Sequence, residues 1–352
     1  MFCYLISIGK YIIMKKMYIK FIIITFITGV FTLVSCESSG DEFYENGFFE
    51  LCNIENNLDG LEIRALEFDS KGNAWIGTCK HGIIRYNKKG IEVYNSDNSA
   101  IPKDFLIWDI AIDKKDNVWI GYSGEGLDGG LLKYDGNTFT KYNSKNTAMP
   151  EDIVWDIEVD SKNNLWIASC RIRQGGLVKY DGTEWTVYTP SNSVLPVNDI
   201  HSIAIDQSDN VWLALGEYVG QGSLVKISNN EWNVYTEKEL GFQPYYWDNI
   251  QCDSKNRLWG SLSYVLSSFS GPHFPNVIIF DGEKTTLLSY DDLPGITLDI
   301  NNYVWYIGNG LWIDNRWTKL NNSKFRGKNI YFVKESLDHR IWIVTEDGIY
   351  IK

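Results

Sequence analysis

The sequence has few of the residues on which metal sites and histidine-dependent active sites are built, with four His and six Cys among 352 residues. None of the cysteines has the spacing of a metal-binding motif, and no cofactor motif is present, so neither a metal nor a cofactor is expected. Basic residues are also scarce, and the chain carries a formal charge of −12. A chain this acidic is not expected to bind nucleic acid, whose phosphates require a basic surface.

What the chain does have is a repeat marked by tryptophan. Seven Trp residues follow short alternating segments at intervals of 37 to 47 residues, and six of them lie six residues after an Asp. A period of this length is typical of the four-stranded unit of a β-propeller. The sequence therefore predicts an all-β, seven-bladed β-propeller with four antiparallel strands per blade. The marker residues are Trp75, Trp119, Trp166, Trp212, Trp259, Trp305 and Trp342.

The third copy shows the strand pattern within one repeat. It predicts strands at 154–159, 165–168, 176–180 and 185–188, with Asp181-Gly182 as the tight turn before the last strand. An Asp-x-x-x-Asn turn lies between the first two strands, and its oxygens could bind calcium or simply accept backbone N–H bonds within a hairpin. The second interpretation is preferred because the turn lacks the bidentate Glu of a calcium loop.

The final copy ends after its third strand, while an unmatched strand pattern stands near the N-terminus at 47–52. This segment precedes the first repeat as each outer strand precedes the next repeat. We therefore expect residues 47–52 to supply the missing outer strand of the last blade and so close the propeller within the domain 47–352, which removes an exposed sheet edge.

The first 35 residues resemble a bacterial lipoprotein signal peptide. Basic residues precede the apolar stretch 21–34, and Leu33-Val34-Ser35-Cys36 matches a lipobox. Cys36 is therefore the predicted lipidation site, with residues 36–46 as an acidic tether, and the protein is expected on the bacterial outer membrane, facing the periplasm or the cell surface. An uncleaved signal anchor is the alternative, and translation can begin at Met1, Met14 or Met17. The mature chain would carry 29 basic and 45 acidic side chains.

The repeated motifs resemble the two-component regulator propeller repeat. The second copy has Asp-x-x-x-Asn-x-Trp-Ile-Gly at 113–121 and Gly-Leu-x-Lys-Tyr-Asp-Gly at 130–136, and the resemblance covers nearly all of 47–352. It implies kinship to periplasmic sensor domains of hybrid two-component systems of Bacteroidetes, many of which recognise oligosaccharides. In those sensors, paired propellers precede a membrane segment and a kinase. The present chain departs from them by having one propeller, a predicted lipid anchor and no kinase.

The residues that break the repeat are the candidates for ligand binding. One varying position opens the innermost strand of each repeat, and the loops after the second strand are longer in repeats two to five. Aromatic faces and hydrogen-bonding groups together suit a sugar ring, so we expect an oligosaccharide or another small molecule at the channel mouth, or else a protein partner. The candidates are Arg64, Trp108, Trp155, His201, Asp248 and Tyr331 on the strands, and Arg171, Arg173, Tyr218, Tyr264 and His273 in the loops.

Two interpretations remain open for this region. Trp108 and Trp155 share their strand parity with Ile110 and Ile157, so they would alternatively pack between blades rather than face a ligand. Seven-bladed propellers of similar repeat type also include streptogramin lyases, which use His, Glu and Mg²⁺ at the channel mouth. His81, His201 or His273 with Glu125 or Glu217 could supply such groups here, but no pair has motif support. A non-catalytic binding propeller is the preferred prediction.

Overall fold

The computed structural model divides into two units, Met1–Gly47 and Phe48–Lys352. In the first unit, β1 (Phe21–Ile24) pairs antiparallel with β2 (Leu33–Cys36). The structure describes residues 21–24, 33–36, 50–51 and 61–351, except for gaps at 88, 104, 125–128, 172–173, 217–221, 245–246, 263–276, 289–295, 299–303, 307–309, 314–315, 320–329 and 346–347. Within these ranges it does not describe the side chains of Cys170, Asp248, Leu288, of residues before Leu61, or of 296–330.

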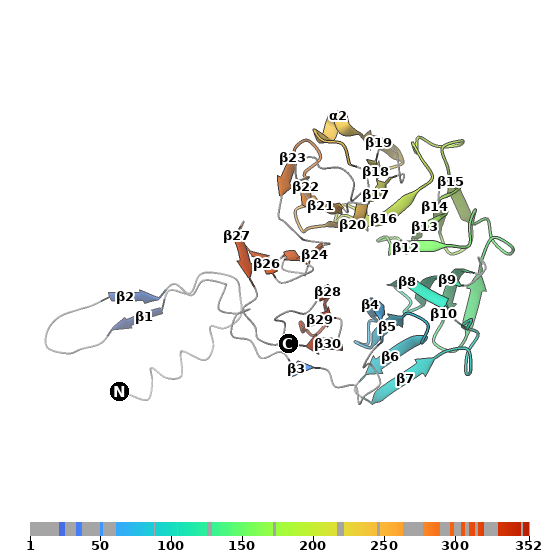
Figure 1. Ribbon diagram of the computed structural model, residues 1–352, viewed down its shortest axis with the longest axis horizontal. Helices are drawn as coiled ribbons and strands as arrows, with labels where there is room; N and C mark the ends of the chain where they lie inside the picture. The colour runs from blue at the N-terminus through green and yellow to red at the C-terminus, as the bar shows by residue number, and fades with distance from the viewer. Residues whose placement is uncertain are drawn as a thin grey trace, which may run out of the picture. The chain divides into compact units, whose positions relative to one another are not determined.

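The second unit is a series of four-stranded antiparallel sheets that follow one another along the chain (Figure 1). In each sheet of the propeller the first strand lies innermost, as predicted. The first blade consists of β4 (Ile63–Phe68), β5 (Ala74–Thr78), β6 (Ile83–Asn87) and β7 (Gly90–Tyr94). The next blades are β8 (Phe105–Ile112), β9 (Val118–Gly124), β10 (Gly129–Tyr134) and β11 (Phe139–Tyr142), then β12 (Val154–Val159), β13 (Leu165–Arg171), β14 (Gln174–Tyr180) and β15 (Trp185–Tyr188).

The fourth and fifth blades continue this order. They consist of β16 (Ile200–Ile205), β17 (Val211–Leu215), β18 (Ser223–Ser228) and β19 (Glu231–Tyr235), then β20 (Trp247–Cys252), β21 (Leu258–Leu262), β22 (Val277–Phe280) and β23 (Thr285–Leu288). A one-turn helix, α2 (Glu237–Leu240), connects β19 to the following strand.

The terminal blade is formed by both ends of the second unit. It consists of β28 (Ile330–Glu335), β29 (Ile341–Thr345), β30 (Gly348–Ile351) and β3 (Glu50–Leu51). Glu50 and Leu51 pair antiparallel with Ile351 and Tyr350, which puts the N-terminal strand in the outermost position. This is the pairing expected for the segment 47–52.

The predicted number of blades is wrong, because the structure shows six. Six innermost strands line one central channel, namely β4, β8, β12, β16, β20 and β28. The repeat around Trp305 gives a further small sheet of strands three or four residues long. These strands are β24 (Ile296–Leu298), β25 (Val304–Tyr306), β26 (Gly310–Ile313) and β27 (Arg316–Lys319).

The sequence of this copy differs from the others at one turn position. Tyr303 stands where the other turns have Asn or Arg, although the Asp and the Trp at the expected interval are both retained.

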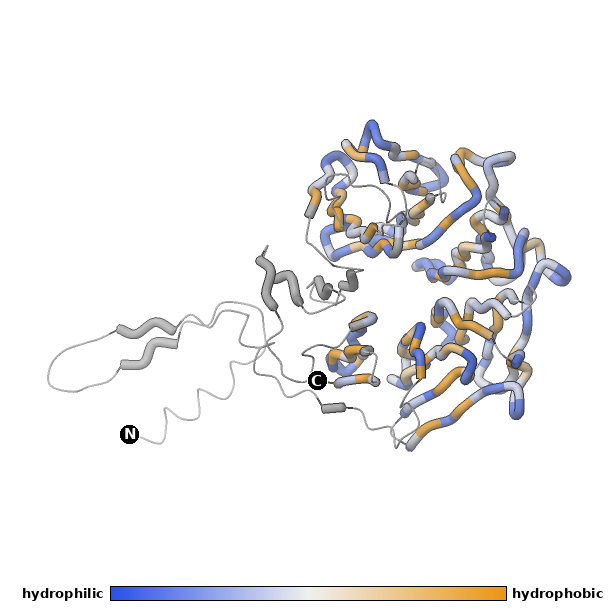
Figure 2. The backbone as a smooth tube through the Cα atoms, viewed as in Figure 1, coloured by the Kyte–Doolittle hydropathy of each residue, from blue (hydrophilic) through white to orange (hydrophobic). Residues whose placement is uncertain are grey.

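Burial falls from the second strand of a blade to its outer strand. The second strand of each blade is buried on both faces, as in β5, β17 and β29, whereas the outer strand β7 is largely exposed. Figure 2 shows the apolar residues concentrated on strands and the polar residues in the connecting turns. The marker Trp of five blades packs into a core shared with the next blade, as Trp75 does with Ile110 and Trp119 does with Ile157. Burying such side chains contributes about 2 to 3 kcal/mol each.

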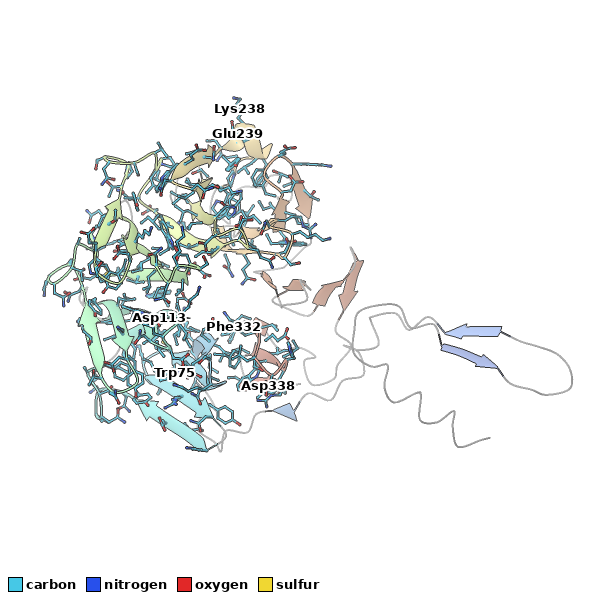
Figure 3. All side chains as sticks on the ribbon, turned by 180° about the vertical axis from the view of Figure 1, so that it is seen from behind. Trp75, Asp113, Lys238, Glu239, Phe332 and Asp338 are labelled. Carbon is cyan, nitrogen blue, oxygen red and sulfur yellow. The ribbon has the colours of Figure 1, made fainter. Side chains whose placement is uncertain are left out.

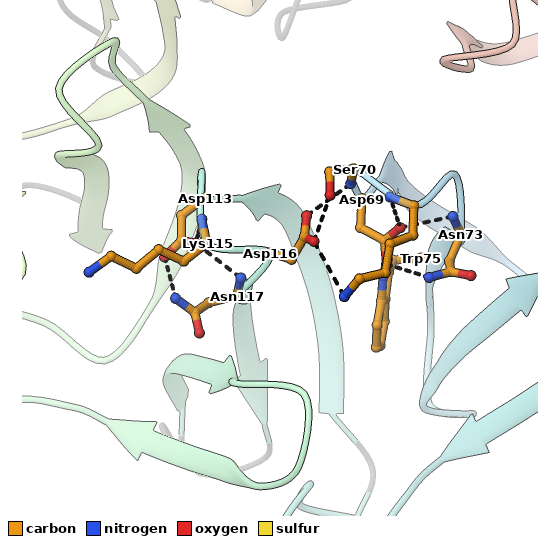
Figure 4. Close-up of polar contacts among 9 residues, drawn as sticks. Asp69, Ser70, Asn73, Trp75, Asp113, Lys115, Asp116 and Asn117 are labelled. Atoms are coloured by element: carbon orange, nitrogen blue, oxygen red, sulfur yellow. Dashed lines mark hydrogen bonds and ion pairs between the residues drawn. The ribbon is translucent and has the colours of Figure 1, made fainter.

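The Asp-x-x-x-Asn turns are structural, as preferred from the sequence. Asp69 accepts hydrogen bonds from Asn73 N at 2.9 Å, Asn73 Nδ2 at 2.6 Å and Trp75 Nε1 at 3.1 Å (Figure 4). Asp113 and Asp160 repeat this pattern. The Asp thus joins the turn to the buried Trp of the same blade, and its oxygens are used within the hairpin.

Candidate functional site

The channel through the six blades contains a cavity of about 680 Å³. Its wall is made by the innermost strands, because each has one edge toward the channel and the other edge paired with the second strand of its blade. No helix of the described residues is long and apolar enough to cross a membrane. Five of the predicted ligand residues line the channel cavity: Arg64, Trp108, Trp155, His201 and Tyr331.

A β-bulge interrupts every innermost strand at the predicted site position. The register shifts between Ile107 and Asp109 around Trp108, and between Val154 and Asp156 around Trp155. The bulge inserts one extra residue and resets the alternation of side chains. Trp108 and Trp155 are consequently half-buried and line the cavity, although parity alone would assign them to the core with Ile110 and Ile157. The equivalent bulges surround Arg64, His201, Asp248 and Tyr331.

Four of the bulge residues form a continuous row along the channel mouth, which we call the aromatic arc: Arg64, Trp108, Trp155 and His201. The rings of Trp108 and Trp155 lie 4.7 Å apart at 32°, and those of Trp155 and His201 lie 6.3 Å apart at 66°. The Arg64 guanidinium lies 5.5 Å from the Trp108 ring centroid. Four consecutive blades thus contribute one planar group each to a single surface.

Hydrogen bonds hold the arc in place. Trp108 Nε1 donates to Ser123 Oγ at 2.8 Å, and His201 Nε2 donates to the Gly216 carbonyl at 2.9 Å. Burial lowers the pKa of His201, so this imidazole is neutral near pH 7. Arg64 forms an ion pair with Glu62 at the rim. Two of the four planar groups of the arc are therefore held by hydrogen bonds, and a cation stands at its end.

The other predicted residues are distributed as follows. Tyr331 lines the same cavity and is exposed, while Arg171 ends β13 and is exposed to solvent. Asp248 belongs to β20, but its side chain lies outside the described residues, as does that of Cys36 in β2. Four loop candidates also fall outside the described residues: Arg173, Tyr218, Tyr264 and His273.

Sequence reasoning missed a set of charged residues deeper in the channel. Asp109 and Asp156 follow the bulges by one residue, and Glu67, Glu158 and Lys334 follow them by three, and all five line the cavity. The signal that could have found them is a charged side chain at a fixed offset from the varying position of the innermost strand. Their place inside the channel distinguishes them from ordinary surface charges.

Burial dominates the electrostatics of these carboxyl groups. It raises the pKa of Asp109 to about 8, with a further contribution from nearby Asp156, and it raises the pKa of Asp156 and Glu158 as well. Burial alone would lower the pKa of Lys334, but the Glu67 carboxylate 2.6 Å from its Nζ raises that pKa on balance. At neutral pH the channel interior therefore contains a protonated Asp109 carboxyl group and one ion pair.

The groups expected for the lyase alternative are not assembled by the described residues. His81 is exposed, and its Nδ1 lies 2.8 Å from the Cys79 carbonyl, while His273, Glu125 and Glu217 lie outside the described residues. Within the described ranges, no three His, Cys, Asp or Glu side chains are grouped to hold a metal ion.

Comparison with known proteins defines the class of fold. No protein-family model matches the chain, and no curated protein matches it. The extracellular domain of the hybrid two component system BT4673 from B. thetaiotaomicron is similar over 87% of this chain and 43% of its own length, with 21% identity and a TM-score of 0.67. The extracellular domain of the hybrid two component system BT3049 from the same organism is similar over 86% of this chain and 40% of its own length, with 18% identity and a TM-score of 0.63.

An enzyme shares the same fold. A catalytically inactive virginiamycin B lyase from Staphylococcus aureus is similar over 86% of this chain and 98% of its own length, with 13% identity and a TM-score of 0.61. The chain spans less than half the length of the two-component structures it matches. These similarities show a β-propeller fold, which is also the fold of these extracellular domains and of this lyase.

Proposed function

We propose that this protein is a non-catalytic, sensor-like binding propeller that captures a ligand at its channel mouth. The observation that carries the proposal is the aromatic arc at the cavity of about 680 Å³. Stacked Trp faces bind the C–H face of a sugar ring, and neighbouring polar groups bind its hydroxyls. A glycan fragment is therefore the proposed ligand, and a protein partner at the same face is the alternative outcome of the test.

The similarity to extracellular domains of two-component systems supports a sensor-like role outside the cytoplasm. The lipobox at Leu33–Cys36 supports attachment to the outer membrane through a lipid on Cys36. Labelling cells with radioactive palmitate tests the anchor directly. The wild-type chain should incorporate label and Cys36→Ala should not, and equal incorporation would remove the anchor from the proposal.

A glycan-array screen tests the binding site. We expect the full chain to bind a defined group of oligosaccharides, and Trp108→Ala with Trp155→Ala to weaken that binding by more than about tenfold, since each stacked aromatic contributes about 1 kcal/mol. Trp232→Ala is the matched control, because Trp232 packs on the core near Tyr188 and does not line the cavity. Glycan binding that survives the double substitution would place the site elsewhere.

A further inference from the structure

Successive blades are joined by two kinds of polar contact besides their shared apolar cores. The first lies in the channel, where in the second, third and fourth blades the residue after the bulge accepts a backbone N–H from the next blade; the first blade has Ala65 there and forms only the second kind of contact. Asp109 accepts from Ile157 N at 2.9 Å, and Asp156 accepts from Ile203 N at 2.7 Å. Ser202 Oγ accepts from Ile250 N at 3.2 Å in the same way. These bonds join the second, third, fourth and fifth blades.

The second kind of contact lies at the opposite end of the innermost strands, between hairpin turns. The third residue after the turn Asp accepts a backbone N–H from the turn of the preceding blade. Asp116 accepts from Ser70 N at 2.9 Å and Ser70 Oγ at 2.7 Å (Figure 4). Asn163 accepts from Lys114 N at 2.7 Å. Two further turn contacts follow: Asp209 with Ser161, and Asn256 with Gln207.

The seam between the terminal blade and the first blade cannot form either contact. We call it the terminal seam, and the other four described blade-to-blade seams internal seams. At the channel position the terminal blade has Phe332 (labelled in Figure 3), whose side chain has no acceptor. At the turn position the first blade has Gly72, which has no side chain to accept the N–H of Leu337. Leu337 is 61% exposed.

An ion pair takes the place of these contacts. Lys334 Nζ of the terminal blade lies 2.6 Å from Glu67 Oε2 of the first blade. The two side chains are 42% and 27% exposed, so water in the channel screens their attraction. An apolar core around Trp342, Leu66 and Ile76 also spans the seam. An internal seam therefore has hydrogen bonds to the backbone of the neighbouring blade, whereas the terminal seam has one solvent-accessible ion pair.

We infer that the terminal seam is the place where the propeller opens most readily among its five described seams, and that the Lys334–Glu67 ion pair is its latch. The latch lines the same cavity as the aromatic arc. Opening there would separate the first blade from the terminal blade while the internal seams stay closed. Only the internal seams have hydrogen bonds from one blade to the backbone of the next, and these bonds oppose opening.

Hydrogen exchange of the full chain, followed by mass spectrometry, tests this inference. Amides of β4 and β28 should exchange at least about fivefold faster than those of β12 and β16, and 1 M salt should widen the difference by screening the latch. Lys334→Met should accelerate exchange in β4 and β28 more than in β12 and β16. Lys226→Met is the matched control, because Lys226 lies 4.8 Å from the Trp212 ring within one blade.

A gain-of-contact variant provides an independent test. Gly72 has φ +76°, and a Cβ there would meet no atom within 4 Å. Asn163 and Asn256 adopt the same left-handed conformation at the equivalent position. Gly72→Asn should therefore accept the Leu337 N–H and slow exchange in β4 and β28 by about threefold or more, whereas Gly72→Ala should not.

The inference is overturned if all six inner strands exchange at the same rate, or if Lys334→Met accelerates β12 and β16 as much as β4 and β28. If Lys334→Met fails to fold, the comparison of Gly72→Asn with Gly72→Ala decides. Equal exchange in those two variants overturns the inference, and selective slowing in Gly72→Asn supports it.

Discussion

The blade β12–β15 and the terminal blade share one topology but differ in whether the indole N–H of their recurring Trp has a hydrogen-bond acceptor. In the former, Trp166 Nε1 donates to Asp160 Oδ2 at 3.1 Å. In the latter, Ser336 replaces the Asp and bonds instead to Asp338 and the Arg340 carbonyl, so Trp342 Nε1 is buried without a hydrogen-bond partner. The comparison shows that the Trp is kept for its apolar surface, and that the polar contact is an addition that one blade lacks.

The largest expected effect comes from removing the Asp where it is used. Asp160→Ala leaves Trp166 Nε1, Asn164 N and Asn164 Nδ2 without their acceptor, so we expect the free energy of unfolding to fall by about 3 kcal/mol. Ser336→Ala in the terminal blade should have a clearly smaller effect. Urea denaturation of both variants measures the difference, and equal losses would contradict it.

A second comparison uses the channel position at which the third blade has Asp156, the second has Asp109 and the terminal blade has the non-titrating Phe332. The pKa of Asp109 is about 8 in the folded state, above its usual value of 3.8. The contribution of Asp109 to the free energy of unfolding is therefore fully present below about pH 4 and is lost as the pH rises through 8. Asp156 and Glu158, whose pKa values are also raised, act in the same direction.

The expected result is a free energy of unfolding that decreases from pH 5 to pH 9. Asp109→Asn should flatten this dependence, because an amide keeps the acceptor for Ile157 N and does not ionise. Asp135→Asn is the control, since turn hydrogen bonds lower the pKa of exposed Asp135 and it remains ionised across this range. A slope unchanged by Asp109→Asn would refute the assignment.

The smallest expected effect comes from adding a hydrogen-bond acceptor to the terminal blade. Ser336→Asp supplies the acceptor that Trp342 Nε1 lacks and should stabilise the protein by about 1 kcal/mol. Ser336→Ala serves as the comparison, because it supplies no acceptor. Thermal melting would record the gain as a higher Tm, and a Ser336→Asp protein no more stable than wild type would show that the unpaired indole has little energetic cost.

Local patterns predicted much of this fold. Strand alternation, the Asp-to-Trp spacing and the Asp-Gly turns act within one repeat, so they can be seen in the sequence. The number of blades was wrong because a Trp at the right interval, Trp305, does not by itself specify a blade. The sequence counts repeats, whereas blade formation depends on contacts between repeats.

The site was only partly predictable for a related reason. The positions of Trp108 and Trp155 were identified from their variation between repeats, but their direction depended on a bulge that leaves no mark in composition. Asp109 and Lys334 were missed because their proximity arises only when blades far apart in sequence surround one channel. Neither effect can be derived from the alternation within a single strand.

The bulges also bear on how new binding properties can arise in this architecture. Each is set by backbone pairing and recurs around Arg, Trp, Trp, His, Asp and Tyr in the six blades. The kink is fixed by strand pairing and not by the side chain that it holds. The same backbone position therefore accepts a cation, an indole, an imidazole, a carboxylate or a phenol in different blades.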